Sequence, residues 1–82
     1  MMNMTARLNN ILKSTGITVE ATWCNVVGSY TVWCEYHNGT ESRQLCLTGI
    51  ARRTISKRSN QDDIAQDAAL VIVDEVLAFE SR

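Results

Sequence analysis

The stretch that decides the fold is YTVWCEYHNGTESRQLCLT, residues 30–48. Two runs of alternating apolar and polar side chains flank the dipeptide Asn38-Gly39, and such alternation predicts half-buried strands. Asn-Gly is a strong hairpin signal because a type I′ turn needs positive φ at both central residues. The sequence therefore predicts an antiparallel hairpin with strands at residues 30–37 and 40–48.

A two-residue loop at Asn38-Gly39 also predicts the register of this hairpin. The expected pairs are His37–Thr40, Val32–Leu45 and Tyr30–Leu47. Because opposed residues share a face, the apolar side chains fall together on one face, which carries Tyr30, Val32, Cys34, Leu45 and Leu47. On the other face Trp33 is the only large apolar group. The hairpin thus predicts one core face and one open face.

A third strand precedes the hairpin. Apolar residues alternate with polar ones over residues 17–24, and a turn follows at residues 26–29. If the parity continues, the core face gains Ile17, Val19, Ala21 and Trp23. The open face then carries Thr18, Glu20, Thr22, Cys24, Thr31, Trp33, Glu35, Ser42, Gln44 and Cys46.

Apolar residues at helical spacing occur in the sequence both before and after these strands. The residues Met4, Leu8, Ile11 and Leu12 form an apolar stripe on a helix over residues 4–14, with Asn3 as N-cap and Gly16 as stop. A second helix is predicted over residues 60–80, with Ser59 as its cap and Asp62 at its third position. Its core stripe is Ala65, Ala68, Ala69, Ile72, Val76 and Phe79, widened by Ile64, Val71, Val73 and Leu77.

These elements predict an α+β fold of order α-β-β-β-α, with a three-stranded antiparallel sheet and both helices packed on one face. The 82 residues suffice for a single domain, 1–82, and 45% hydrophobic with 21% charged residues is typical of globular chains. The longest apolar run, residues 68–73, is too short to span a membrane. The first residues do not resemble a secretory signal, so we expect a cytoplasmic protein without membrane contact.

Catalytic and metal-binding signals are weak. A zinc site could combine Cys24, Cys34, Cys46 and His37, but structural zinc sites usually show two tight ligand pairs and only Cys34-x₂-His37 is one. The lone histidine is expected to be exposed beside the hairpin turn. Glu20 and Glu35 lie on an open face that offers no pocket to shift a pKa. We therefore expect no metal, no cofactor and no enzymatic activity.

Two features favour binding. The basic loop, which we define as Arg52, Arg53, Lys57 and Arg58, precedes a helix start, where backbone N–H groups attract anions. It either contacts phosphate or pairs with acids of the C-terminal helix. Trp33 is either an interface anchor or packs against a neighbouring loop. The predicted partner-binding residues are therefore Trp33, Arg52, Arg53, Lys57 and Arg58.

The order of elements resembles the double-stranded RNA-binding domain over nearly the whole chain. Residues 30–39 look like that family's second strand and turn, and residues 63–69 look like its alanine-rich second helix. The resemblance implies RNA binding through lysines at the start of that helix, where Asp62 and Asp63 stand here. Acids at these positions repel phosphates, so a protein partner is favoured over nucleic acid.

In size and style the chain is also similar to phage-encoded inhibitors, including anti-CRISPR proteins. The functional hypothesis is a non-enzymatic protein that docks on a macromolecular partner, as a phage inhibitor of a host nucleic-acid-handling complex of the CRISPR type. One alternative is a double-stranded RNA-binding module that uses the 52–58 loop. Another is a homodimer formed through the open sheet face.

Overall fold

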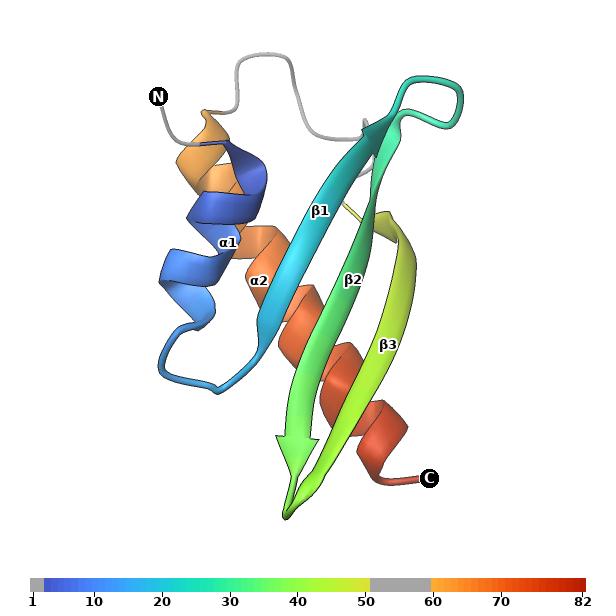
Figure 1. Cartoon of the computed structure of the whole chain (residues 1–82). Coiled ribbons are helices and arrows are strands. Elements are labelled where there is room, and N and C mark those ends of the chain that lie inside the picture. Colours follow the sequence, from blue (N-terminus) through green and yellow to red (C-terminus); the bar gives the residue numbers. More distant parts are fainter. Residues whose placement is uncertain (1–2, 51–59) are drawn as a thin grey trace.

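The computed structural model describes residues 3–50 and 60–82. Along the chain it contains α1 (Met4–Leu12), β1 (Thr18–Cys24), β2 (Ser29–Asn38), β3 (Glu41–Ile50) and α2 (Gln61–Glu80). The strands form an antiparallel sheet in the order β1-β2-β3. Both helices lie on one side of the sheet (Figure 1). The predicted α+β class and element order are confirmed.

The β2–β3 hairpin turns one residue later than its sequence predicts. Asn38 pairs with Glu41, so the loop is Gly39-Thr40, and Gly39 takes a positive φ of 65° at the first loop position. The predicted pairs were wrong by two residues, because Leu45 lies opposite Cys34. Side chains alternate with a period of two, so this shift leaves each side chain on its predicted face.

A β-bulge lets two apolar residues near the end of β3 both reach the core. Val32 pairs with Leu47, whereas Tyr30 pairs with Ile50. Between these two pairs β3 therefore contains one more residue than β2. Gly49 supplies a φ of 72° within the bulge. Without the extra residue, Leu47 and Ile50 would point to opposite faces, but both are buried.

The core lies between the sheet and the two helices. Among its most deeply buried side chains are Leu8 and Leu12 of α1, Val32 of β2 and Ile72 of α2. Two asparagines cap the helices. Asn3 Oδ1 accepts from the Ala6 N–H, and Asn60 Oδ1 accepts from the Asp63 N–H, each at 2.8 Å.

The helix limits correct the sequence prediction at two points. The N-cap of α2 is Asn60 rather than Ser59, so Asp63 and not Asp62 stands at the third position. The first helix ends at Leu12 rather than at residue 14. The Thr15 hydroxyl donates to the Leu12 carbonyl at 2.6 Å, which supplies a partner for one of the carbonyls left free at the helix end.

Helix α1 closes the outer edge of β1 with two polar side chains. Asn9 holds both backbone groups of Val19, donating from Nδ2 at 2.9 Å and accepting at Oδ1 at 2.8 Å. The Thr5 hydroxyl accepts from the Ala21 N–H at 3.0 Å and lies 3.2 Å from the Ala21 carbonyl. These side chains stand where another strand would bond, so they protect that edge from pairing with other chains.

Three residues expected in the core are exposed. Trp23 is 44% exposed, and the first turn of α1 contacts the strand two residues before it, where Thr5 bonds to Ala21. Its ring stacks edge-on against Tyr30 with centroids 5.0 Å apart, and its Nε1 donates to Asn25. Val71 and Leu77 also face outward, so α2 buries a narrower stripe than its sequence predicts.

Candidate functional site

The uncovered face of the sheet is centred on one aromatic side chain. Trp33 lies in the middle strand with Glu20 of β1 and Cys46 of β3 directly opposite it, and it is 56% exposed. Its neighbours on β2, Val32 and Cys34, point the other way and are buried. An indole held on a rigid central strand loses little conformational entropy on binding, which suits it to anchor an interface.

The described residues around Trp33 carry negative charge and no Lys or Arg, and the imidazole of His37 lies toward the hairpin end of the same face. The carboxylates are Glu20 and Glu35, and the Gln44 amide donates to Glu35 at 3.3 Å. The other predicted members of this face are threonine, serine and cysteine: Thr18, Thr22, Cys24, Thr31, Ser42 and Cys46. Such a face repels phosphate groups.

The cysteines divide between the two faces of the sheet. Cys34 is 1% exposed, and burial, helped by the nearby Cys46, raises the pKa of its thiol to about 11. Cys46 is exposed on the opposite face and Cys24 is partly buried there. The zinc alternative therefore lacks convergent ligands, and the described residues contain no group of three or more metal-ligating side chains.

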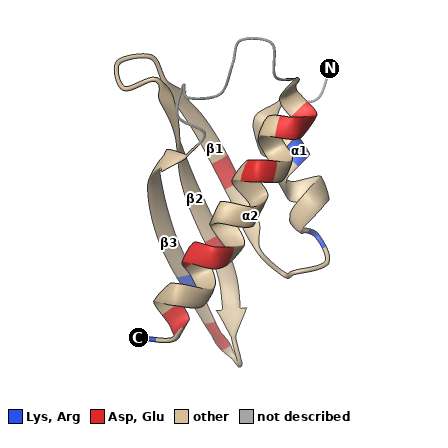
Figure 2. Cartoon of the chain, turned by 180° about the vertical axis from the view of Figure 1, so that it is seen from behind, with Lys and Arg blue, Asp and Glu red and all other residues tan. Residues whose placement is uncertain are grey.

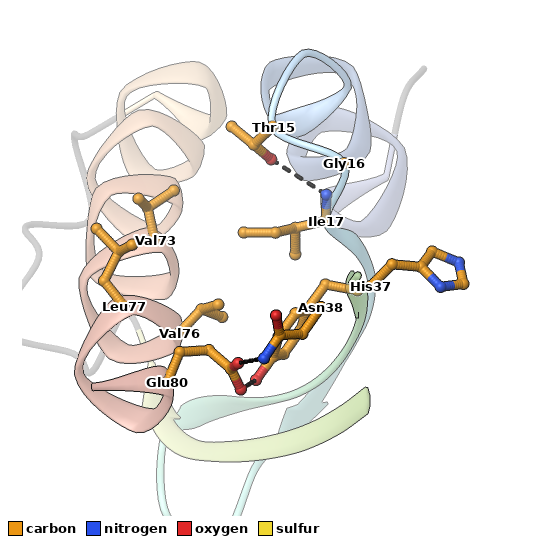
Figure 3. Close-up of a pocket in the computed structure, with 10 residues that line it drawn as sticks. Thr15, Gly16, Ile17, His37, Asn38, Val73, Val76, Leu77 and Glu80 are labelled. Atoms are coloured by element: carbon orange, nitrogen blue, oxygen red, sulfur yellow. Dashed lines mark hydrogen bonds between the residues drawn. The ribbon is translucent and has the colours of Figure 1, made fainter. Parts of the chain in front are cut away.

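A groove opens on the helical side, between α2 and the chain that enters β1 (Figure 3). Its volume is about 430 Å³, and its wall includes Ile17, Val73, Val76 and Leu77. The imidazole of His37 points away from these side chains in the close-up. The groove is thus an apolar depression rather than a site with an evident acid or base.

One end of the groove is closed by a cluster of polar side chains around Glu80. Its carboxylate accepts from the Tyr36 hydroxyl at 2.6 Å and from Asn38 Nδ2 at 2.5 Å, and it lies 3.7 Å from Arg43. Burial of Tyr36, with its hydrogen bond to Glu80, raises the pKa of the phenol to about 12. The cluster ties the end of α2 to the β2–β3 hairpin.

The groove and this cluster were missed by the sequence reasoning. Glu80 lies 44 residues from Tyr36 and 42 from Asn38, and no local pattern connects positions so far apart. The only available signal was the amount of apolar surface on α2. Leu77 widened the expected core stripe, although the sheet and α1 are too small to cover it.

The basic loop of Arg52, Arg53, Lys57 and Arg58 lies outside the described residues. What is described is the start of α2, where Asp62 and Asp63 occupy the first turn. Asp62 forms an ion pair with Arg7 of α1. The place where the RNA-binding resemblance implies lysines is therefore acidic, and one of its acids contacts the neighbouring helix.

No protein-family model, no curated protein and no solved structure matches this chain. The α-β-β-β-α arrangement is compatible with the double-stranded RNA-binding fold that the sequence resembles. In the described part of the chain, neither helix is long and apolar enough to cross a membrane.

Proposed function

We propose that this chain is a non-enzymatic binding protein that docks on a protein partner through the open face of its sheet, with Trp33 as the anchor. The observation that carries the proposal is the 56% exposure of Trp33 in the middle strand, on the face of the sheet that no described helix covers. Tryptophan is enriched among the residues that dominate binding energy, and such residues lie near the centre of an interface.

The charges around Trp33 support a protein partner over nucleic acid. Nucleic-acid affinity comes mainly from Lys and Arg contacts to phosphates, and Glu20 and Glu35 flank the indole instead. Aromatic side chains also stack on bases, but single-strand binders of that kind combine stacking with a basic groove. A protein surface with apolar and basic groups meets no such repulsion.

The biological setting that we propose is inhibition of a host nucleic-acid-handling complex of the CRISPR type by a phage-encoded protein. Complexes that handle nucleic acid present basic surfaces, and an acidic binder is drawn to them. The α2 helix supports this proposal, because it carries six acids and no Lys or Arg (Figure 2). Electrostatic attraction of this kind speeds association and favours partners of opposite charge.

Partner capture followed by affinity measurement tests the docking proposal. We expect Trp33→Ala to weaken binding of the captured protein roughly thirtyfold or more, about 2 kcal/mol, through faster dissociation. Trp23→Ala is the matched control, because it removes an exposed indole from the other face and should leave affinity within about threefold. Equal losses for both variants would contradict an anchor at position 33.

A second pair of measurements separates the protein and nucleic-acid hypotheses. Reversing Arg52 and Arg53 to glutamate should change mainly the rate of association with the protein partner and its salt dependence, and should leave dissociation nearly unchanged. If that reversal abolishes binding while Trp33→Ala has no effect, the basic loop is the true site. Titration of duplex RNA across salt concentrations then shows whether the loop binds nucleic acid, because phosphate-driven affinity falls steeply with salt. A concentration-dependent mass that Trp33→Ala abolishes would instead identify the open face as a homodimer contact.

A further inference from the structure

A second apolar surface lies on α2, on the opposite side of the sheet from Trp33. Leu70 and Leu77 are 66% and 63% exposed, and Val73 between them is partly exposed. Residues spaced at i, i+3 and i+7 lie on one face of a helix, so these three form a continuous row. We call this row, together with the groove beside it, the α2 ridge.

The ridge begins where α1 stops covering α2. Asp62 and Gln66 share a depression with Arg7, Asn10 and Ile11 of α1, so α1 flanks the first turns of α2. Farther along, α2 lines the groove, and the described residues across from it are the chain around Ile17 and the end of β2. Leu70, Val73 and Leu77 continue the row that starts at Gln66, and Leu70 and Leu77 are exposed there.

Carboxylates border this apolar row. Asp67 and Asp74 stand three residues before and four residues after Leu70, and Asp74 stands three before Leu77, so they are neighbours on the helix surface. Acidic segments recur along α2 in the view of Figure 2. None of the ion pairs between described residues includes Asp67 or Asp74.

The charges decide which occupant fits the ridge. A second copy packing its own ridge here would bring the same carboxylates together, and a nucleic acid would bring phosphates, so both meet repulsion. A protein element with apolar side chains flanked by Lys or Arg fills the groove and neutralises Asp67 and Asp74. Partly desolvated pairs of opposite charge also fix the register of such a contact.

From this arrangement we infer that the α2 ridge is a second docking surface, for a protein element that presents apolar side chains flanked by Lys or Arg. The apolar side chains enter the groove beside Val73 and Leu77, and the cations face Asp67 and Asp74. The ridge and the open face lie on opposite sides of the sheet, so one domain is able to contact two protein surfaces at once. The inference does not depend on the role of Trp33.

An amphipathic helical peptide of leucine and lysine is the probe, with a leucine–glutamate peptide of equal length as its counterpart. Amide resonances of the labelled protein are followed by NMR during titration. We expect the lysine peptide to shift resonances at residues 70–77 and around Ile17, with affinity that falls as salt rises. The glutamate peptide should bind about tenfold more weakly or worse, because like charges then meet.

Substitutions of exposed residues locate the contact and should leave the domain folded. Circular dichroism checks that each variant is folded. Leu70→Ser combined with Leu77→Ser should weaken the lysine peptide about tenfold or more, and Asp67→Asn combined with Asp74→Asn should remove most of the salt dependence. Trp33→Ala should leave this binding unchanged. The inference is overturned if the peptides bind equally, if the shifts gather around Trp33, if neither peptide binds, or if the ridge self-associates.

Discussion

The two faces of the sheet differ although a single strand supplies both. Along β2, Val32, Cys34 and Tyr36 point toward the helices and are buried, whereas Trp33, Glu35 and His37 point away and are exposed. Neighbours in sequence thus have opposite surroundings, because side chains alternate along a strand. The covered face contributes the buried core, and the open face leaves Trp33 exposed.

Under the proposed function, stability and binding are separable at the level of single residues. The covered face packs against α1 and α2, so a change there leaves a cavity. The open face contacts no described helix, so a change there should cost little stability and, under the proposed function, should act on partner binding. Matched substitutions or chemical probes on the two faces therefore test whether the covered face determines stability and the open face does not.

The largest expected effect is on the covered face. Ile72 of α2 is fully buried against the sheet, so Ile72→Ala should lower the free energy of unfolding by about 2–4 kcal/mol. Leu70→Ala, two residues away and exposed, should cost under about 0.5 kcal/mol. Urea titration measures both values. A loss below about 1 kcal/mol for Ile72→Ala would mean that the covered face is not the energetic core.

Thiol chemistry compares the faces without changing the sequence. Cys46 is exposed, whereas Cys34 is buried and its pKa is raised to about 11, so it offers little thiolate near neutral pH. A short pulse of iodoacetamide, read by peptide mass spectrometry, should label Cys46 roughly a hundredfold faster or more than Cys34. Denaturation should bring the two rates together. Similar rates in the native protein would show that the covered face opens readily.

The smallest expected effect concerns the polar end of the covered face. The pKa of Tyr36 is raised from 10.0 to about 12, so the folded protein holds the phenolic proton more tightly than the unfolded chain. This stabilisation is complete below pH 10 and is lost as pH rises through about 12. Tyrosinate absorbance should therefore show one late-titrating phenol that Tyr36→Phe removes.

Glu80→Gln is the matched control for that titration. It keeps the size of the side chain and removes the carboxylate that holds the Tyr36 hydroxyl. The late phenol should then titrate at lower pH, while burial still keeps its pKa above the ordinary value. A late phenol that survives in Tyr36→Phe would assign the shift to another tyrosine.

The sequence predicted correctly which face of the sheet most strand side chains occupy, but it did not predict which residues pair across the β2–β3 hairpin. Alternation alone placed Val32 and Trp33 on opposite faces, and the two-residue error in register changed neither. The error arose because Gly39 rather than Asn38 starts the loop. Trp23 lies on its predicted face but is exposed, because alternation does not show how far a helix covers the strand.

The candidate site was only partly predictable for the same reason. Trp33 stood out as the one large apolar side chain on a polar face, a property that local pattern reveals. The groove requires the end of α2, the chain before β1 and the hairpin to meet, and that is tertiary information. The α2 ridge was hidden because Leu77, which is exposed, was counted among the residues that widen the core stripe of Ile72.

The most direct test of the central claim is whether a partner covers Trp33. The chain labelled with 5-fluorotryptophan gives two ¹⁹F resonances, one for Trp23 and one for Trp33, which a Trp23→Phe variant assigns. Unlabelled captured partner adds no signal of its own. We predict that the Trp33 resonance shifts or broadens on binding while the Trp23 resonance stays in place. A partner that binds tightly and leaves the Trp33 resonance unmoved would contradict docking through the open face.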